Sequence, residues 1–303
     1  VKVGNRADRG GQGQDIFWAG QVMGATTKIA WCDSTLNPWI GCTRVGPGCD
    51  HCYAEQQDSR KRWGSATHWG VGVPRYRTSA SNWTQPLAWN RKAEASGKPW
   101  RVFCASLADV FDNEVLDEWR TDLWALISAT PHLTWLLLTK RIGNVVYPMP
   151  SNVWLGATMV NQEEYERDWP KLRAVPATKR FISYEPALGQ INFYFHQLER
   201  AESALPDWVI IGGESGSKAR TFDITWARSA VEQCKAAGVA CFVKQLGARP
   251  YADDPSSRRN KPFRYKQRYC DDDTGQAWVQ LLDRAGANPD EWPSDIRVRA
   301  FPQ

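Results

Sequence analysis

Three cysteines lie close together in the segment NPWIGCTRVGPGCDHCYAE, residues 37–55 of the 303-residue chain. Cys42, Cys49 and Cys52 form a C-x6-C-x2-C pattern, whereas the other cysteines of the chain are scattered. Thiolates are soft ligands that suit zinc and iron–sulfur clusters. Bunched cysteines of this kind favour a metal or cluster site over a disulfide framework.

Zinc and a 4Fe–4S cluster are the two candidates for this segment. A structural zinc site takes four protein ligands, but the three cysteines supply only three. His51 is poorly placed to complete the same tetrahedron, and Cys32 lies ten residues before Cys42. A 4Fe–4S cluster usually has four cysteine ligands, so three cysteines leave one iron open for a small molecule. The cluster is favoured, and zinc stays the alternative.

Apolar runs from residue 100 onward alternate with stretches of helical periodicity. Buried strands are predicted at 101–106, 133–139, 152–158, 180–185, 207–213 and 240–245, and helices at 114–130, 162–175 and 224–238. A first strand near 28–32 and a short helix near 276–285 are also expected. Repeated β-α units of this spacing predict an α/β fold with a parallel sheet in a partial or full barrel.

Polar residues end nearly every predicted strand. In parallel β-α folds, chemistry collects at the carboxyl ends of the strands. These ends carry Ser106, Asp109, Thr139, Lys140, Thr158, Asn161, Tyr184, Glu185, Gly212, Gly213, Glu214, Lys244 and Gln245. Any strand must leave the core through polar residues, but a ring of charged and amide groups on one rim predicts a functional site there.

Composition adds broad limits. The net charge of +5 is modest, and no uninterrupted apolar run approaches 18 residues, so a membrane span is not expected. No secretion signal is recognisable at the N-terminus, and a cytoplasmic location is predicted. Residues 1–26 are expected to be a flexible lead, 27–248 the barrel, and 249–303 a C-terminal extension.

The C-terminal extension interleaves Phe263, Tyr265 and Tyr269 with Arg264, Lys266 and Arg268. Cations that meet phosphate and rings that stack on bases suit a nucleic-acid groove. An edge strand that packs its aromatic rings inward would give the same pattern.

Several rim residues have two interpretations. Gly212, Gly213 and Glu214 either bring backbone and carboxylate to a ligand or form a turn with a buried Glu–Lys pair. Lys140 and Arg141 either bind a carboxylate or phosphate or pair with Glu185. Cys104 precedes Ser106 by two residues, so both should share one strand face. Cys104 is then either a hydrogen-atom donor to a substrate radical or a packing residue.

The motif order resembles that of a known family. KIAWCDSTLNPWIGCTRVGPGCDHCYAE, SLADVF, LLLTKR, WLGAT, ISYEPALG, DWVIIGGESG and FVKQLG, spanning about residues 27–248, resemble a phage- and prophage-associated three-cysteine-motif family. That family is regarded as radical S-adenosylmethionine (SAM)-like and has no settled function. The usual radical-SAM spacing is C-x3-C-x2-C, from which this chain departs. There is also a distant analogy to spore photoproduct lyases, three-cysteine enzymes that act on DNA.

The resemblance implies a fold and a set of roles. It implies a partial (β/α)6-type parallel barrel of the radical-SAM kind, in which Cys42, Cys49 and Cys52 ligate a 4Fe–4S cluster. His51 would lie beside the adenine of SAM and Ser106 near its methionine amine. Asn161 and Glu185 would hydrogen-bond the ribose or methionine. The Gly-Gly-Glu letters match a radical-SAM motif but follow a different strand, so their role is not carried over.

The leading hypothesis is therefore a radical-SAM enzyme that forms a 5′-deoxyadenosyl radical and modifies or repairs DNA or RNA. Such an enzyme would need an electron donor such as a flavodoxin or ferredoxin. The alternatives are a zinc-stabilised nucleic-acid-binding protein without catalysis and an iron–sulfur redox protein that does not bind SAM.

Overall fold

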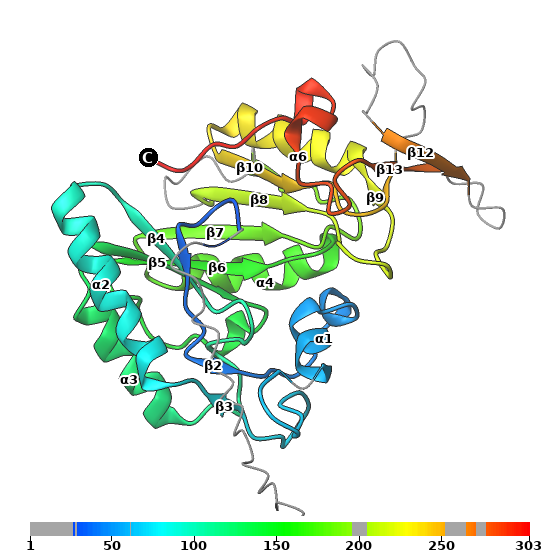
Figure 1. The fold of residues 1–303 in the computed structure, drawn as a ribbon. Helices are drawn as coiled ribbons and strands as arrows, with labels where there is room; N and C mark the ends of the chain where they lie inside the picture. Colours follow the sequence, from blue (N-terminus) through cyan, green and yellow to red (C-terminus); the bar gives the residue numbers. More distant parts are fainter. Residues whose placement is uncertain (1–26, 28, 61, 196–204, 252–264, 271–276) are drawn as a thin grey trace, which may run out of the picture.

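Seven parallel strands form the central sheet of the computed structural model, which describes residues 27, 29–60, 62–195, 205–251, 265–270 and 277–303. The strand order is β1-β4-β5-β6-β7-β8-β10 (Figure 1). Their bounds are β1 Ser34–Thr35, β4 Trp100–Cys104, β5 Leu133–Thr139, β6 Val153–Thr158, β7 Lys179–Tyr184, β8 Trp208–Gly212 and β10 Ala240–Gln245. Strands β1 and β10 stand at the two edges, so the sheet is open and the predicted partial barrel is confirmed.

Helices connect the strands as parallel pairing requires. They are α1 Tyr53–Ser59, α2 Ala80–Ser96, α3 Asp117–Ser128, α4 Gln162–Ala174 and α6 Ile224–Ala237. The predictions of α3, α4 and α6 are confirmed, and Gly238, with φ of 68°, caps the C-terminus of α6. Helix α2 escapes sequence prediction because it contains Pro86 and has little apolar periodicity; Ser79 caps its first turn by accepting a hydrogen bond from the Asn82 amide.

Alternation along the strands divides the apolar side chains between two layers. Val102 and Cys104 of β4 point toward the helices and belong to the large outer core. Phe103, between them, joins a separate inner cluster, because successive side chains of a strand point to opposite faces. The inner cluster consists of Trp31, Phe103, Leu136, Phe181, Trp208, Ile210 and Phe242. These rings and aliphatic chains fill the inside of the partial barrel.

The N-terminal strand prediction needs correction. The first strand, β1, begins at Ser34 and not near residue 28, and Lys28 lies outside the described residues. Trp31 contributes its ring to the inner cluster instead, 4.6 Å from the ring centroid of Phe103. The apolar residues before Ser34 therefore pack inside the barrel and do not form a strand of its sheet.

The C-terminal residues and a short strand that directly precedes α6 form a second, four-stranded sheet in the order β12-β13-β11-β9. Its strands are β9 Phe222–Asp223, β11 Pro250–Tyr251, β12 Tyr265–Cys270 and β13 Ala277–Leu281. The predicted helix near 276–285 is therefore wrong. The sequence AWVQL of β13 pairs antiparallel with β12, and a strand of that length fits its apolar alternation. The remaining small elements are the pair β2 Trp39–Ile40 and β3 Tyr76–Arg77, and the 3-10 helices η1 Pro47–Cys49, η2 Ile142–Asn144, η4 Pro289–Glu291 and η5 Ser294–Ile296.

Residues close to the C-terminus cover the free edge of β10. The Val243 amide donates to Val298 O at 2.8 Å, and the Ala300 amide donates to Cys241 O at 2.8 Å. Phe301 packs on Trp208 and Phe242 with ring centroids 5.3 Å apart in each case. Part of the predicted C-terminal extension is thus built into the barrel.

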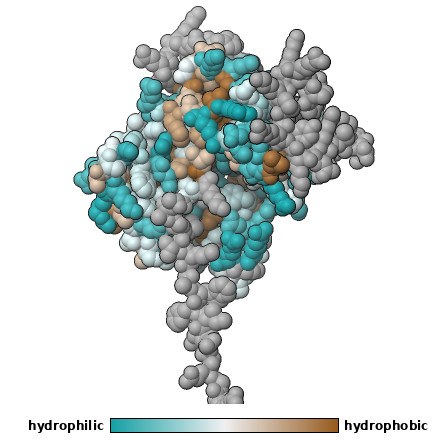
Figure 2. All heavy atoms as spheres, turned by 45° about the horizontal axis from the view of Figure 1, so that its top comes forward, coloured by the Kyte–Doolittle hydropathy of each residue, from teal (hydrophilic) through white to brown (hydrophobic). Residues whose placement is uncertain are grey.

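None of the described helices has the length and apolar character to cross a bilayer. Figure 2 shows hydrophilic side chains over much of one face, with apolar side chains gathered in its upper half.

A substitution at Gly156 of β6 tests the packing of the inner cluster. It pairs with Phe181 of β7, and a Cβ atom at residue 156 would overlap the Phe181 ring, which Trp31 and Trp208 hold in place. We expect Gly156→Ala to lower the free energy of unfolding by about 1–3 kcal/mol, the usual cost of overpacking, as measured by urea denaturation. Gly143→Ala, where a Cβ meets nothing within 4 Å, is the control; equal stability of the two variants would contradict this packing.

Candidate functional site

A cavity of about 810 Å³ lies at the carboxyl ends of the parallel strands. Its volume falls in the range of roughly 300–1,000 Å³ that small-molecule sites occupy. The cavity is lined by many of the residues singled out from the sequence, namely Cys42, Cys49, His51, Cys52, Ser106, Lys140, Glu185, Gly213 and Glu214. The rim of the sheet and the three-cysteine segment therefore form one site.

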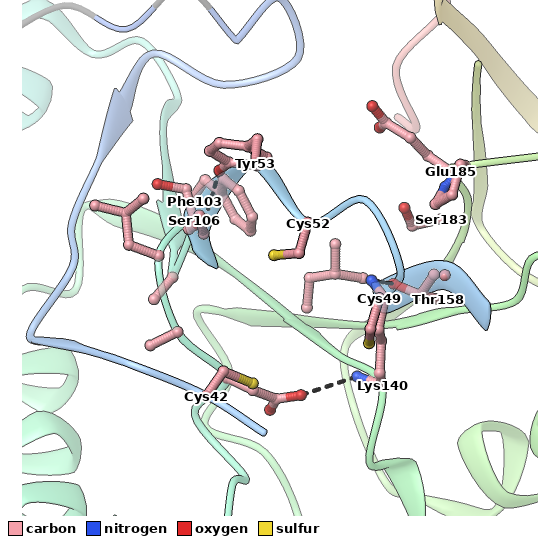
Figure 3. A pocket seen from close by; sticks show the side chains of 18 of the residues that line it. Cys42, Cys49, Cys52, Tyr53, Phe103, Ser106, Lys140, Thr158, Ser183 and Glu185 are labelled. Carbon is pink, nitrogen blue, oxygen red and sulfur yellow. Dashed lines mark hydrogen bonds between the residues drawn. The ribbon is translucent and has the colours of Figure 1, made fainter. Parts of the chain in front are cut away.

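Each of the three cysteines comes from a different local structure. Gly41 forms a parallel bridge with Ala108, which sets Cys42 beside the strand ends. Cys49 ends η1, and Cys52 immediately precedes α1. The Cys52 amide donates to Cys49 O at 3.2 Å, so a tight turn joins the last two cysteines. Figure 3 shows all three side chains in the same pocket.

Burial raises the pKa of two of the three thiols. Burial, reinforced by the nearby Asp109 carboxylate, raises the pKa of Cys42 to about 12 even though the Arg141 guanidinium opposes the shift. Burial also raises the pKa of Cys52. Metal ligation by a thiol releases its proton, so a bound cation would replace these protons.

Arg141 is buried next to Cys42 and does not stand free on the rim. Its side chain is 8% exposed, and Nη1 donates to Cys42 Sγ at 3.4 Å while Nη2 donates to Thr43 O at 2.6 Å. It also pairs with Asp109 at 3.3 Å and Asp112 at 3.5 Å. The expected role of Arg141 in binding a carboxylate or phosphate ligand is corrected, because its donors are used within the protein.

Lys140 presents a half-buried ammonium group to the cavity. Nζ donates to Thr158 Oγ1 at 3.1 Å, and no ion pair joins it to a carboxylate in the described part of the chain. Its stem passes close to the cysteine segment: a Cβ atom on Gly48 would lie 3.3 Å from Lys140 Cε and 2.8 Å from Val160 Cγ1. Glycine at position 48 lets the segment approach the lysine, whose charge is available to an anionic ligand.

Glu185 takes Lys244 as its partner, not Lys140 or Arg141 as one interpretation of the sequence proposed. Glu185 directly follows β7 and Lys244 belongs to β10, so the two side chains reach across the end of β8. A Cβ atom on Gly212, at the end of β8, would lie 3.2 Å from Glu185 Cδ. Gly212 therefore serves the site by leaving room for this carboxylate.

Glu214 joins the cysteine segment to the opposite side of the sheet. His51 Nδ1 lies 3.0 Å from Glu214 Oε2, and Arg220 binds Glu214 through its guanidinium and through its backbone amide at 2.8 Å. Arg220 also donates to Pro47 O at 2.8 Å and to Asp50 Oδ2 at 3.2 Å. The Glu214 carboxylate is thus already occupied, and Glu214 and Arg220 together hold the cysteine segment.

Close backbone packing explains why the second residue of the Gly-Gly-Glu motif, Gly213, is a glycine. A Cβ atom there would lie 2.5 Å from Leu246 O and 2.9 Å from its carbonyl carbon, so the backbones after β8 and β10 pack directly on each other. The backbone carbonyl of Gly213 accepts a hydrogen bond from Gln245 Nε2 at 2.8 Å.

Three residues singled out from the sequence lie elsewhere. Cys104 is fully buried in the outer core, because β4 ends at Cys104 and alternation does not continue to Ser106. Asn161 caps α4 by accepting a hydrogen bond from the Glu164 amide at 2.9 Å. Gly212 shapes the space of Glu185 without lining the cavity. The interpretations of Cys104 as a hydrogen-atom donor and of Asn161 and Gly212 as cofactor ligands are therefore corrected.

Other cavity residues were not identified from the sequence. Asn37 holds Ser106 through a hydrogen bond between Nδ2 and Ser106 Oγ at 3.1 Å, and Tyr53 donates to Ser106 O at 2.5 Å. Trp31, Trp69 and Phe103 supply aromatic walls. The position of Tyr53 directly after Cys52 is the only sequence signal for this group.

The donor set fits a metal cluster in its chemistry. Three thiols from one short segment line one cavity, which is the ligand type that iron–sulfur clusters take. Among the described residues, however, no three His, Cys, Asp or Glu side chains already stand at the spacing of a metal site. The three cysteines fit an iron–sulfur cluster by residue type and by their location in one cavity, although their side chains do not already stand at metal-binding spacing.

Comparisons with known proteins identify a family. A family model described as "Protein of unknown function (DUF5131)" matches residues 26–280. The chain belongs to this family. The match includes the barrel and extends to β13, beyond the expected limit at residue 248.

The chain was also compared with curated proteins and with solved structures. No curated protein matches the chain. A solved structure, a spore photoproduct lyase mutant with bound AdoMet and dinucleoside spore photoproduct, is 13% identical with a TM-score of 0.40, covering 82% of this chain and 68% of that one.

The Glu214 carboxylate makes a testable contribution to stability. Burial alone would raise the pKa of Glu214, but hydrogen bonds from Arg220 and His51 outweigh it and lower the pKa from 4.5 to about 2. A lowered pKa stabilises the fold above the unfolded-state value, and this stabilisation is lost as the pH falls through the folded-state value.

Glu214→Gln should therefore cost about 1–3 kcal/mol of unfolding free energy at pH 7. The difference from wild type should shrink between pH 4.5 and 2. Urea denaturation across this pH range measures it, with Glu232→Gln on the exposed face of α6 as a control. A pH-independent difference would contradict the assignment.

Proposed function

We propose that this chain is a radical-SAM enzyme, with Cys42, Cys49 and Cys52 as the ligands of a 4Fe–4S cluster. The observation that carries the proposal is the meeting of three thiols from one segment with a ring of polar side chains in one cavity at the carboxyl ends of a parallel sheet. When bound, the cluster would supply the electron that cleaves the sulfonium bond of SAM to give a 5′-deoxyadenosyl radical.

The charged side chains of the cavity divide the binding task. Lys140 offers its ammonium group to the methionine carboxylate, since it has one hydroxyl partner and no carboxylate partner among the described residues. Glu185 and Lys244 form a pair that can accept from and donate to the same ligand. Ser106, fixed by Asn37, places a hydroxyl group on the cavity wall, near Tyr53 and across the pocket from Glu185 (Figure 3).

The apolar walls protect the reaction. Trp31, Phe103 and Leu138 line the inner end of the cavity above the filled centre of the barrel. They exclude water from one side, which favours chemistry on a reactive species.

The first test is anaerobic reconstitution with iron and sulfide. The reduced wild type should show an electron paramagnetic resonance signal that shifts when SAM is added. Cys42→Ala, Cys49→Ala and Cys52→Ala should each lose most of the bound iron, because three ligands are the minimum for the proposed site. Cys104→Ala is the matched control, since this thiol lies in the outer core, and should retain the cluster. A colourless protein that binds zinc instead would overturn the proposal.

Lys140→Gln tests the binding of SAM separately from the cluster. Loss of a charge-assisted hydrogen bond costs about 1.5–3 kcal/mol, and every 1.4 kcal/mol is a tenfold change in affinity. We therefore expect SAM binding to weaken by roughly tenfold or more, measured by isothermal titration with the reconstituted protein. Lys218→Gln, on an exposed part of the same rim, should bind SAM as wild type does. Equal affinities in the two variants would remove Lys140 from the SAM site.

DNA or RNA remains the proposed substrate class, and an external electron donor such as a flavodoxin or ferredoxin the proposed partner. The aromatic and basic side chains that suggested nucleic acid, from Phe263 to Tyr269, lie outside the residues whose side chains are described. Salt-dependent binding of single-stranded and duplex oligonucleotides would test this substrate class, because phosphate contacts release counterions.

A further inference from the structure

Among the described residues, Arg141 places a positive charge beside the three-cysteine site, because its guanidinium group donates a hydrogen bond to a cysteine sulfur. Nη1 lies 3.4 Å from Cys42 Sγ. The same guanidinium group binds the carbonyl oxygen of the next residue, Thr43, at 2.6 Å. Arg141 therefore fixes the sulfur of Cys42 and the backbone of the residue that follows it.

A buried set of charges holds Arg141 in this position. Asp109 accepts its Nη1 at 3.3 Å, and Asp112 lies 3.5 Å from its Nη2. Asp109 is fixed in turn by the hydroxyl group of Thr139 at 2.8 Å and by the Lys140 amide at 3.0 Å. The guanidinium group has little freedom to turn away from the sulfur.

Arg75 completes the set and provides a built-in comparison. It is fully buried, pairs with Asp112 at 2.7 Å, and donates to Thr43 Oγ1 at 2.7 Å. It shares with Arg141 both an acidic partner and the residue after Cys42, but no hydrogen bond joins it to a cysteine sulfur among the described contacts. The two arginines and two aspartates balance in charge.

This balance matters when thiolates and a cluster bring negative charge into the site. In a low-dielectric interior, a charge with no partner is costly, and a donor on a ligand sulfur offsets part of the added charge. The reduced cluster carries one more negative charge than the oxidised cluster and gains more from that donor. Hydrogen bonds to the sulfurs are among the factors that set the reduction potential of iron–sulfur clusters.

We propose that Arg141 is a positioning residue for the cluster: its guanidinium group orients Cys42 and, through the hydrogen bond to Sγ, raises the reduction potential of the site. This inference rests on the proposed function, since it requires a cluster at the three cysteines. It assigns to Arg141 a role toward the cofactor and none toward substrate.

The experiment compares Arg141→Lys with Arg75→Lys in the reconstituted full-length protein. Both variants keep the buried positive charge and lose a guanidinium fork, so they should lose similar stability in thermal unfolding. Arg141→Lys should shift the midpoint potential of the cluster to a more negative value in a redox titration followed by electron paramagnetic resonance. Arg75→Lys should leave the potential of the wild type unchanged.

A second measurement does not depend on the potential. Wild-type protein produced with isotope-labelled arginine should show a weak magnetic coupling between the reduced cluster and a guanidinium nitrogen. That coupling should be absent in Arg141→Lys and present in Arg75→Lys.

The outcomes separate two failures. A wild-type protein without a cluster would overturn the proposed function and this inference together. A wild-type cluster whose potential and nitrogen coupling are the same in both arginine variants would overturn this inference alone and leave the proposed function standing.

Discussion

The buried ion pairs between Arg141 and the carboxylates of Asp109 and Asp112 are the contacts on which the site depends. Asp109 and Asp112 follow β4, Arg141 follows β5, and the guanidinium group reaches the segment that follows β1. Three neighbouring strand ends are thereby joined through one cation. Without that cation, two acidic groups would remain buried without full compensation, which proteins tolerate poorly. The position of Cys42 is therefore coupled to the integrity of this part of the sheet.

A second support acts at the other end of the same segment. Arg220 connects Pro47 and Asp50 to Glu214, after β8. The cysteine segment is thus held by Arg141 near its beginning and by Arg220 in its middle, from opposite sides of the sheet. A loop fixed at two points can keep several ligands near one cavity while the space between them stays open, as cofactor sites require.

Periodicity was sufficient to predict the fold class and most strands of the barrel, because buried parallel strands are nearly continuous apolar runs. Helix α2 and strand β13 were missed or misread, since their patterns are short or interrupted and tertiary packing decides them. For the site, the rule that strand ends meet predicted which residues gather. It could not assign Arg141 to Cys42 or Lys244 to Glu185, because such pairs depend on side-chain directions at strand ends where alternation stops.

Phe301 and Trp31 pack in the same inner cluster although almost the whole chain separates them in sequence. Contacts between such distant residues are formed late, because a long loop must close first. During synthesis the ribosome releases the strands in order, but the aromatic interior of the barrel stays incomplete until residues near position 300 have emerged. The edge of the sheet that carries the cysteine segment and the aromatic interior are thus completed at different times. A nascent chain holds its cysteine segment before the aromatic interior of the barrel is complete.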